Sequence, residues 1–363
     1  MTKYLIVNAD DLGISVPVNQ AVRRASRSGI VTSASLLANM PAFRHAVEEV
    51  IRPDPRLGVG VHLCLTSGRP VLTPEKVPLL ADPAGGRFRH GFLGIWRLVC
   101  SRRREEALRQ IGQELAAQVE RVESCGIRPD HLDGHQHVHR IPGVFDLVAR
   151  LAQARKIAVR MASEPFRLGR DPTRFLECLV NAGILKNLVL TCFAMVNRRN
   201  WPGVLTADHY FGILDTGRMT VRRLRGLLRA LPEGVSEVTV HPGLPGDPVF
   251  PLDGEDRTRG DRVQPRKLAR LDGAGALTDC SGQDRRFLRR RQAAEELAAL
   301  ADPAIWGMLA GRGIRLVRFA DIEASHSSGR GVQTARYCAV HGSGIRIPPP
   351  NEDRTACRSP RRG

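Results

Sequence analysis

The sequence predicts an α/β fold, a (β/α) barrel or a close variant, with mostly parallel strands inside and helices outside. Two observations predict it. Short β-rich runs alternate along the chain with amphipathic stretches, which is the pattern of a parallel sheet covered by helices on both faces. The chain has 363 residues and is 42% hydrophobic, which is enough apolar material for a large core.

The first half of the chain opens with the apolar run "KYLIVNADD" (3–11), which predicts a strand that ends in two carboxylates. The stretch 19–29 is amphipathic and stops at a glycine, so we expect a helix there. A strand-like run at 30–39 and a helix at 42–53, which ends near a proline, come next. The apolar segment "LGVGVHLCL" (57–65) predicts the following strand.

The second half opens with a long helix at about 105–124, because apolar residues recur there at helical spacing. Those residues are Leu108, Ile111, Leu115, Val119 and Val122. The remaining expected elements, in chain order, are the stretch "HLDGHQHVH", a helix near 142–154, the run 157–165, a strand at 236–243, a helix at about 287–301 and a closing run at 313–322.

Three insertions interrupt this pattern, at 66–104, 165–215 and 244–284. Connections of this length in a compact domain are usually lids or disordered loops. The last stretch, 323–363, lacks hydrophobic periodicity and holds seven arginines against three acidic residues. We therefore expect one domain over 1–322 and a disordered basic tail over 323–363.

Composition narrows the class of protein. The formal net charge is +18, but the arginines fall in separate clusters with no RNA-binding, zinc-finger or basic-zipper signature, which argues against nucleic acid as the partner. No apolar run reaches the roughly 18 residues of a membrane span. The eight cysteines form no CxxC pair, and the N-terminus lacks the features of a secretion signal. We expect a cytoplasmic protein.

Ionisable residues gather at the predicted strand ends. Asp10 and Asp11 end the first strand, and His62 lies near the end of "LGVGVHL". His241 ends "SEVTVHPG". The stretch "HLDGHQHVHR" adds His131, Asp133, His135, His137 and His139. Because the carboxyl ends of parallel strands form one face, where catalytic groups collect, we expect these side chains to converge.

Each position also has a plain structural interpretation. The pair Asp10–Asp11 could cap a helix, His62 alone is more often a structural histidine, and His241 before Pro-Gly could belong to a turn. Their joint occurrence at four strand ends favours a metal or catalytic site. Two imidazoles and one carboxylate leave positions open on a divalent metal, and a further carboxylate and histidine can move protons. That inventory suits hydrolysis of an amide or ester.

These residues lie in stretches that resemble the YdjC-like carbohydrate deacetylases, the family of chitooligosaccharide deacetylase and the hopanoid-associated deacetylases. The matching stretches, in the expected order, are "YLIVNADDLGIS", "GIVTSASLLAN", "LGVGVHLCLTSGRPV", "PDHLDGHQHVHRIP" and "VTVHPG". The resemblance implies a (β/α)-barrel-like fold, a divalent metal, and removal of N-acetyl groups from amino sugars. It also implies that Asp11, His62 and His135 hold the metal, that Asp10 is the base, and that His241 is the acid.

The resemblance leaves His131, Asp133, His137 and His139 beside the ligands or facing the substrate, and Asp133 is a candidate to accept the second N–H of a ligand imidazole. The family expectation for the metal is Mg²⁺, whereas imidazole ligands suit Zn²⁺, Mn²⁺ or Co²⁺. The expected substrate is an N-acetylated mono- or oligosaccharide, free or lipid-linked. A homodimer is a family-level expectation.

Two other functions stay open at this stage. A metal phosphoesterase would use the basic surface to hold phosphate, but such enzymes often need two metals bridged by carboxylates, and here histidines outnumber carboxylates. The non-enzymatic alternative is an inactive homologue that binds carbohydrate. The joint presence of all five implied site residues argues against it. The resemblance therefore implies a hydrolase of carbohydrate metabolism that cleaves linear amide bonds and uses magnesium.

Overall fold

A curled parallel sheet forms the centre of the computed structural model, which describes residues 2–161, 163–164, 183–244, 282–325 and 334–337. Seven strands follow one another in the order β5-β4-β3-β2-β1-β7-β6, and β8 also pairs with β1. The strands are β1 (Lys3–Leu12), β2 (Ser33–Leu36), β3 (Gly58–Leu63), β4 (His131–Gly134), β5 (Ala158–Val159), β6 (His209–Phe211), β7 (Gly234–Val240) and β8 (Ile314–Leu316). The predicted barrel-like α/β fold is confirmed.

Strand β1 lies at the middle of the sheet, and every pairing within this sheet is parallel. Strands pair with both of its edges: β7 pairs along Lys3–Ala9, while β8 and then β2 pair along the other edge. The register between β1 and β2 shifts between Ala9 and Leu12. This irregularity falls at the two aspartates, where a bulge redirects side chains.

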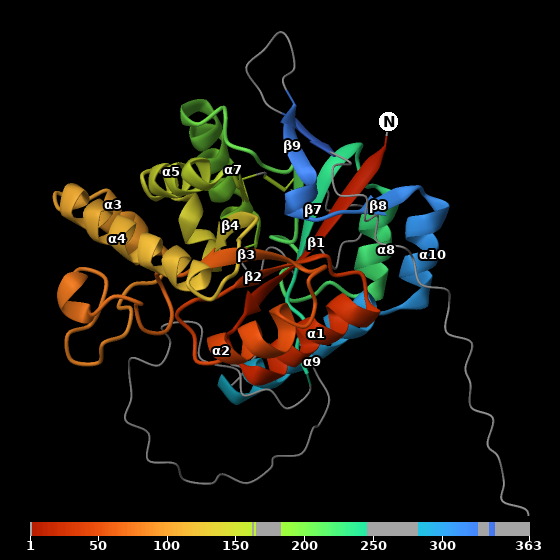
Figure 1. The fold of residues 1–363 in the computed structure, drawn as a ribbon, viewed down its shortest axis with the longest axis horizontal. Helices are drawn as coiled ribbons and strands as arrows, with labels where there is room; N and C mark the ends of the chain where they lie inside the picture. Colours follow the sequence, from red (N-terminus) through yellow and green to blue (C-terminus); the bar gives the residue numbers. More distant parts are fainter. Residues whose placement is uncertain (1, 162, 165–182, 245–281, 326–333, 338–363) are drawn as a thin grey trace, which may run out of the picture.

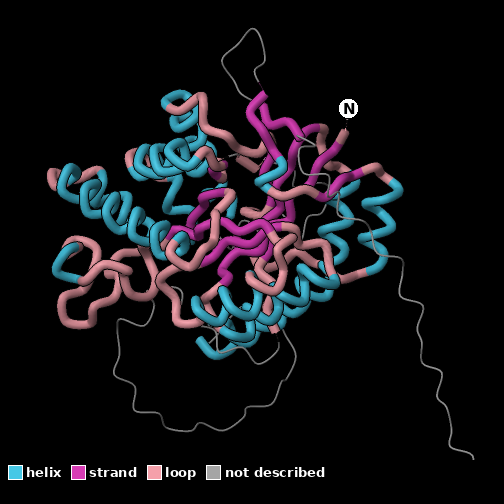
Figure 2. Tube along the Cα trace, in the orientation of Figure 1, coloured by secondary structure: helices cyan, strands magenta, loops and turns pink. Residues whose placement is uncertain are grey.

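Helices surround the sheet, with α1 and α9 together on one side and α3, α4, α5 and α7 on another (Figure 1, Figure 2). The expected long helix is α4, which buries Ile111, Leu115, Val119 and Val122. The α-helices are α1 (Val16–Ser28), α2 (Phe43–Ala46), α3 (Phe92–Val99), α4 (Arg104–Glu123), α5 (Val144–Arg155), α7 (Gly183–Asn200), α8 (Val221–Arg229), α9 (Gly282–Leu300) and α10 (Pro303–Gly311). The short helices are η1 (Val47–Ile51), η2 (Pro74–Lys76), η3 (His135–Arg140) and η5 (Phe319–Asp321).

Two of the three expected insertions contain regular secondary structure in their described parts, so they are not wholly loops. The insertion 66–104 contains α3, and the insertion 165–215 contains α7 and β6. Helix α7 has apolar residues on both its buried and its exposed sides, so it lacks the periodicity that marks an amphipathic helix. The third insertion lies outside the described residues except at its two ends.

The stretch expected to be a basic tail contains part of a second, small sheet. Strand β9 (Ile322–Ser325) pairs antiparallel with β10 (Thr334–Tyr337), and β10 contacts β7. Residues 338–363 lie outside the described residues, so the domain boundary at 322 stays a prediction. Among the described helices, none has the length and apolar content that a bilayer span requires.

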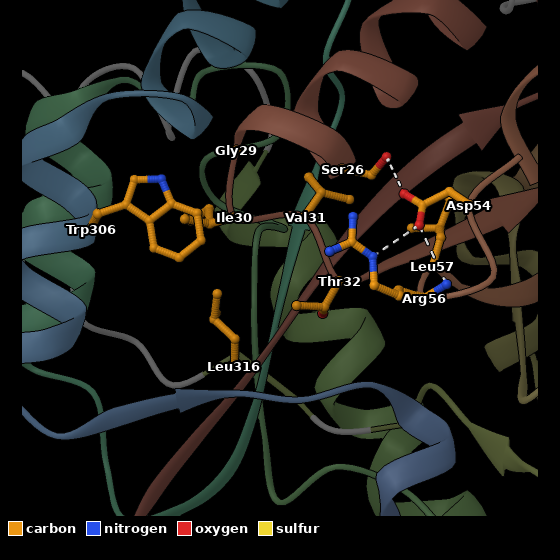
Figure 3. A pocket seen from close by; sticks show the side chains of 10 residues that line it. All are labelled: Ser26, Gly29, Ile30, Val31, Thr32, Asp54, Arg56, Leu57, Trp306 and Leu316. Carbon is orange, nitrogen blue, oxygen red and sulfur yellow. Dashed lines mark hydrogen bonds and ion pairs between the residues drawn. The ribbon is translucent and has the colours of Figure 1, made fainter. Parts of the chain in front are cut away.

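A small cavity lies at the amino end of the sheet (Figure 3). Trp306 of α10 and Leu316 of β8 line it together with Ile30, which precedes β2. Its one carboxylate, Asp54, accepts hydrogen bonds from Ser26 Oγ and from the Arg56 backbone N–H, both at 3.3 Å. The lining thus combines apolar side chains with the polar residues Ser26, Thr32, Asp54 and Arg56.

Candidate metal centre at the carboxyl ends of the strands

The two adjacent aspartates at the end of β1 point to different partners. Asp11 has a left-handed backbone with φ of 63°, a conformation that non-glycine residues adopt only where the surroundings hold it. Together with the bulge, this turn sends the carboxylate of Asp11 toward His62 and His135 and leaves that of Asp10 facing Arg160. Two neighbouring carboxylates are therefore placed in two different environments.

Asp11, His62 and His135 come together as a potential metal site. Each offers one ligand atom, and these atoms all lie within 4.8 Å of one another. Asp11 Oδ1 lies 3.4 Å from His62 Nε2 and 2.9 Å from His135 Nδ1. The other ring nitrogen of His135, Nε2, is buried without a hydrogen-bond partner in the described part of the chain. A buried imidazole nitrogen with no partner is costly unless a ligand satisfies it.

The donor set fits a divalent metal. Two imidazoles and one carboxylate form an open coordination sphere with room for water and substrate. His62 uses Nδ1 to contact Asp133 Oδ1 at 2.8 Å, which leaves Nε2 for Asp11 and the site. Asp133 also accepts a hydrogen bond from Ser35 Oγ at 2.7 Å. A carboxylate that fixes the second nitrogen of a ligand histidine is a usual support of metal sites.

Arg160, which directly follows β5, is the centre of a buried ionic network. Its guanidinium donates from two nitrogens to Asp10 at 2.8 Å each. It also reaches Glu237 Oε1 at 2.6 Å and Asp133 Oδ2 at 2.7 Å. All four groups are buried, so each charge depends on its partners for stabilisation. Asn8 Nδ2 donates a further bond to Asp10 Oδ1 at 2.8 Å.

Burial and nearby charges set the protonation of these groups. Burial disfavours the charged forms of Asp11 and His62, but their mutual contacts and those with His135, Asp10 and Asp133 outweigh it. The pKa of Asp11 is held well below its usual range, and that of His62 is raised well above it. Burial raises the pKa of Glu237 to about 7 even though Arg160 favours its charged form. The Asp11 carboxylate is therefore ionised in the folded protein.

Two of the other histidines support the frame of the site. His131 contacts Asp130 Oδ1 at 2.6 Å and Ser35 Oγ at 3.1 Å, and it stacks on Phe319. A Cβ at position 60 would lie 2.3 Å from the His131 ring, so only a glycine fits there. His139 Nε2 contacts the backbone carbonyl of Arg160 at 2.9 Å. These two rings fix β4 and the following turn against their neighbours.

His137 lies differently from the other histidines of the stretch. Gln136 and His137 both have positive φ, 53° and 60°, so the turn after His135 is strained. The His137 ring meets Tyr210 edge-on with ring centroids 6.1 Å apart. Burial, together with Lys186 and two arginines, holds its pKa well below the usual range. His137 is therefore a neutral imidazole in the wall beside the ligands.

His241 follows directly on β7, one position beyond the pairing of Ala9 with Val240. This register places His241 at the end of the strand that pairs with β1, the strand that carries Asp10. The His241 backbone N–H donates to Glu296 Oε2 at 2.6 Å, which anchors the end of the strand to α9. Its Nδ1 is buried and has no hydrogen-bond partner among the described residues.

Arg160 and Glu237 are the members of the site that sequence reasoning missed. The signal was present, because "IAVRMA" and "VSEVTV" each place one charged residue inside an apolar strand-like run. A charge inside a buried strand needs an opposite charge nearby. Which charges pair could not be read from the sequence, since β5 and β7 lie at different places in the sheet.

Comparison with known proteins places the chain in a family. The family of YdjC-like proteins matches residues 4–310. A carbohydrate deacetylase of Geobacillus stearothermophilus is 43% identical over 170 residues, which is 46% of this chain and 64% of that protein. A carbohydrate deacetylase of Brevibacillus brevis strain 47 is 42% identical over 156 residues, which is 43% of this chain and 58% of that protein. The matched part thus spans less than two thirds of either relative.

A solved structure from Enterococcus faecalis V583, provisionally assigned to cellobiose-phosphate cleavage, has the same fold. It superimposes with a TM-score of 0.60 at 24% identity, and the match covers 88% of this chain and 98% of that chain. The family match extends from β1 to α10 and includes Asp11, His62 and His135. This protein therefore belongs to the family of YdjC-like proteins.

Proposed function

We propose that this protein is a metal-dependent hydrolase that removes N-acetyl groups from amino sugars. One observation carries the proposal: Asp11, His62 and His135 offer three donors within 4.8 Å of one another, while Asp10 is held beside them by Arg160. The name of the two similar relatives, carbohydrate deacetylase, supports the choice of an N-acetylated sugar as substrate.

Asp11, His62 and His135 would hold one divalent metal. When bound, the metal lowers the pKa of a water and polarises the substrate carbonyl. Imidazole nitrogen suits Zn²⁺, Mn²⁺ or Co²⁺, whereas Mg²⁺ prefers an all-oxygen shell. The family expectation of Mg²⁺ therefore stands against the donor chemistry, and metal analysis of the purified protein decides between them.

Asp10 is proposed as the base. A carboxylate has about four lone-pair positions; here Asn8 and one Arg160 nitrogen occupy Oδ1, and the other Arg160 nitrogen occupies Oδ2. One position on Oδ2 is thus left to accept a proton, and this oxygen lies 3.9 Å from His62 Nε2. Arg160 and Asn8 orient the base without using up its capacity.

His241 is proposed as the acid. Its ring nitrogen Nδ1 is buried without a partner in the described structure, and its strand is adjacent to the one that carries Asp10. A base and an acid on neighbouring strand ends can serve the two sides of a scissile amide, the first taking a proton from the attacking water and the second giving one to the leaving amine.

The buried network argues against a two-metal phosphoesterase. Asp10, His62 and Asp133 also bring three donors together. Arg160, however, already neutralises Asp10 and Asp133 at 2.7–2.8 Å. A second cation in that place would face a fixed guanidinium, so a single metal fits the site better.

The test is acetate release from N-acetylglucosamine oligomers, measured with and without a chelator and with each divalent metal restored in turn. We expect release that stops on chelation and returns with the metal. Hydrolysis of phosphate monoesters instead of acetate release would favour the phosphoesterase, and binding of the oligomers without release would favour an inactive homologue. The same panel, extended to lipid-linked amino sugars, would identify the substrate.

Two finer expectations belong to the same proposal. We propose a cytoplasmic location, as the sequence predicts, and a homodimer, which only the family resemblance suggests. Cell fractionation tests the first and sedimentation of the purified protein tests the second. Neither is needed for the proposed chemistry, because the three metal donors, the base and the acid all come from one chain.

A further inference from the structure

Helix α7 exposes an apolar face. Six large hydrophobic side chains are exposed among the described residues, and four of them lie on α7 with exposed fractions between 45% and 62%. They are Leu185, Leu188, Met195 and Val196. The exposed Cys192 lies between them. At about 100° per residue these five positions fall on one side of the helix, and we call them the α7 face.

The opposite side of α7 is already buried in the protein core. The residues buried there are Leu190, Phe193 and Ala194. Helix α7 therefore already packs on the core through this side, and the α7 face is a second apolar side. A helix that is apolar on both sides is typical of an element covered on both sides. Contiguous exposed apolar patches of this kind mark interaction surfaces.

The α7 face is held rigidly beside the proposed metal site. Arg140, at the end of η3, donates to the Leu190 carbonyl at 2.8 Å, and Asn197 Nδ2 donates to the Arg140 carbonyl at 2.9 Å. The ring of Trp96 on α3 meets Phe193 edge-on at 5.3 Å. Helix α7 is therefore fixed to the segment that carries His135, and a surface bound to it would lie about 10 Å, one helix diameter, from that segment.

The charges around the α7 face are basic. Lys186, Arg198 and Arg199 are exposed on α7, and neither α7 nor α3 contains an acidic residue. Arg97 is exposed on α3. On the neighbouring α5, Asp146 accepts a hydrogen bond from the Trp201 indole at 2.7 Å. An apolar stripe with basic residues around it is complementary to a partner that has anionic groups at its surface and an apolar layer below them.

We propose that the α7 face docks on the anionic phospholipid surface of a membrane. Its apolar side chains would enter the boundary between headgroups and acyl chains, while Arg198 and Arg199 contact lipid phosphates. A second copy of the chain fits less well, because a two-fold interface places identical patches together, and neither α7 nor α3 offers an acidic residue to pair with the basic side chains of the other copy. The inference goes beyond the proposed hydrolysis and does not depend on it.

The experiment is co-sedimentation of the full chain with lipid vesicles. We expect binding to phosphatidylcholine vesicles that contain about 30% phosphatidylglycerol, and weaker binding to pure phosphatidylcholine or at high salt. Leu188→Gln/Met195→Gln should lower the partition coefficient about tenfold or more. Arg198→Gln/Arg199→Gln should lower it by about the same factor.

The matched control is Arg225→Gln/Arg229→Gln, which removes the same charge from exposed positions of α8, on the other side of β1 and β7 (Figure 1). We expect it to bind vesicles within about twofold of the unchanged protein. All variants replace exposed side chains, so equal melting temperatures confirm that each is folded.

Three results would overturn the proposal. The unchanged protein stays in the supernatant with anionic vesicles, or it binds neutral vesicles equally well, or the α7 variants bind as it does. A fourth result would reassign the α7 face: if the unchanged protein sediments as a dimer and Leu188→Gln/Met195→Gln sediments as a monomer, the face is an interface between copies. Vesicle binding is measured without substrate, so failure of the proposed hydrolysis is a separate outcome.

Discussion

The two ends of the parallel sheet are built in opposite ways. At the carboxyl end, Arg160, Asp10, Asp133 and Glu237 form a fully buried ionic cluster beside three potential metal ligands. At the amino end, a cavity lined by side chains such as Trp306 and Leu316 holds one carboxylate, Asp54 (Figure 3). The sheet thus carries a buried ionic cluster at its carboxyl end and a cavity with a single carboxylate at its amino end.

This difference separates function from stability. Burying a charge costs several kcal/mol unless its partners are well placed, and apolar packing would stabilise the carboxyl end more simply. The polar residues gather at the end of the sheet where α/β barrels place their catalytic groups. Variants at the carboxyl end should therefore change metal content or turnover, whereas matched variants at the amino end should leave both unchanged.

The largest expected effect follows from His135→Ala. Removing one of three proposed ligands should reduce metal content and abolish acetate release together, because the remaining two donors bind a metal weakly. Metal content per chain and turnover are measured on the same sample. Asp54→Asn, at the amino end, is the control and should keep both. Full metal content in His135→Ala would remove it from the ligand set.

Asp10→Asn comes next. General bases contribute about 10²–10⁴-fold to rate, so turnover should fall in that range while metal content stays near normal. A protein that loses its metal would make Asp10 a ligand, and one that keeps nearly full turnover would remove it from the mechanism.

Arg160→Met and Arg56→Met compare how much the buried network and the Arg56–Asp54 pair at the amino end contribute to the free energy of unfolding. Loss of the Arg160 cation leaves three buried carboxylates without their common partner, which should cost about 3–5 kcal/mol of unfolding free energy. Arg56→Met removes an arginine whose side chain is 72% exposed and 3.5 Å from Asp54, so it should cost at most about 1 kcal/mol. Equal costs in chemical denaturation would show that the two ends are not different.

The smallest effect concerns Glu164, which accepts hydrogen bonds from the Ile213 and Leu214 N–H groups at 2.7 and 2.9 Å. Burial raises its pKa from 4.5 to about 7. The folded protein therefore binds the proton more tightly than the unfolded chain. The stability that this provides is complete below pH 4.5 and is lost as pH rises to about 7.

Glu164→Gln should remove that pH dependence. We expect the fall in unfolding free energy between pH 5 and pH 7, on the order of 3 kcal/mol or less, to become smaller in the variant. Denaturant unfolding at a series of pH values measures it. A pH dependence that is unchanged in Glu164→Gln would assign the proton to another group.

Much of the fold follows from local patterns. The apolar runs at β1, β3 and β7 and the periodic face of α4 were each predictable, because the burial of a continuous run or of one helix side is written in residue spacing. Helix α7 was not, since a helix that is apolar on both sides has no such period. The β9–β10 pair was missed because it is short and lies in a polar stretch.

The sequence by itself determined which residue types would meet at the carboxyl ends of the strands, since a parallel sheet brings those ends to one face. Only the tertiary structure decided how they pair. Asp10 faces Arg160 and Asp11 faces the histidines because of a bulge and one left-handed residue. Contacts such as Arg160 with Asp10 join residues 150 positions apart, and no local pattern specifies a pairing across that distance. Sequence spacing encodes which side of an element is buried, whereas strand order and backbone turns encode which buried groups touch.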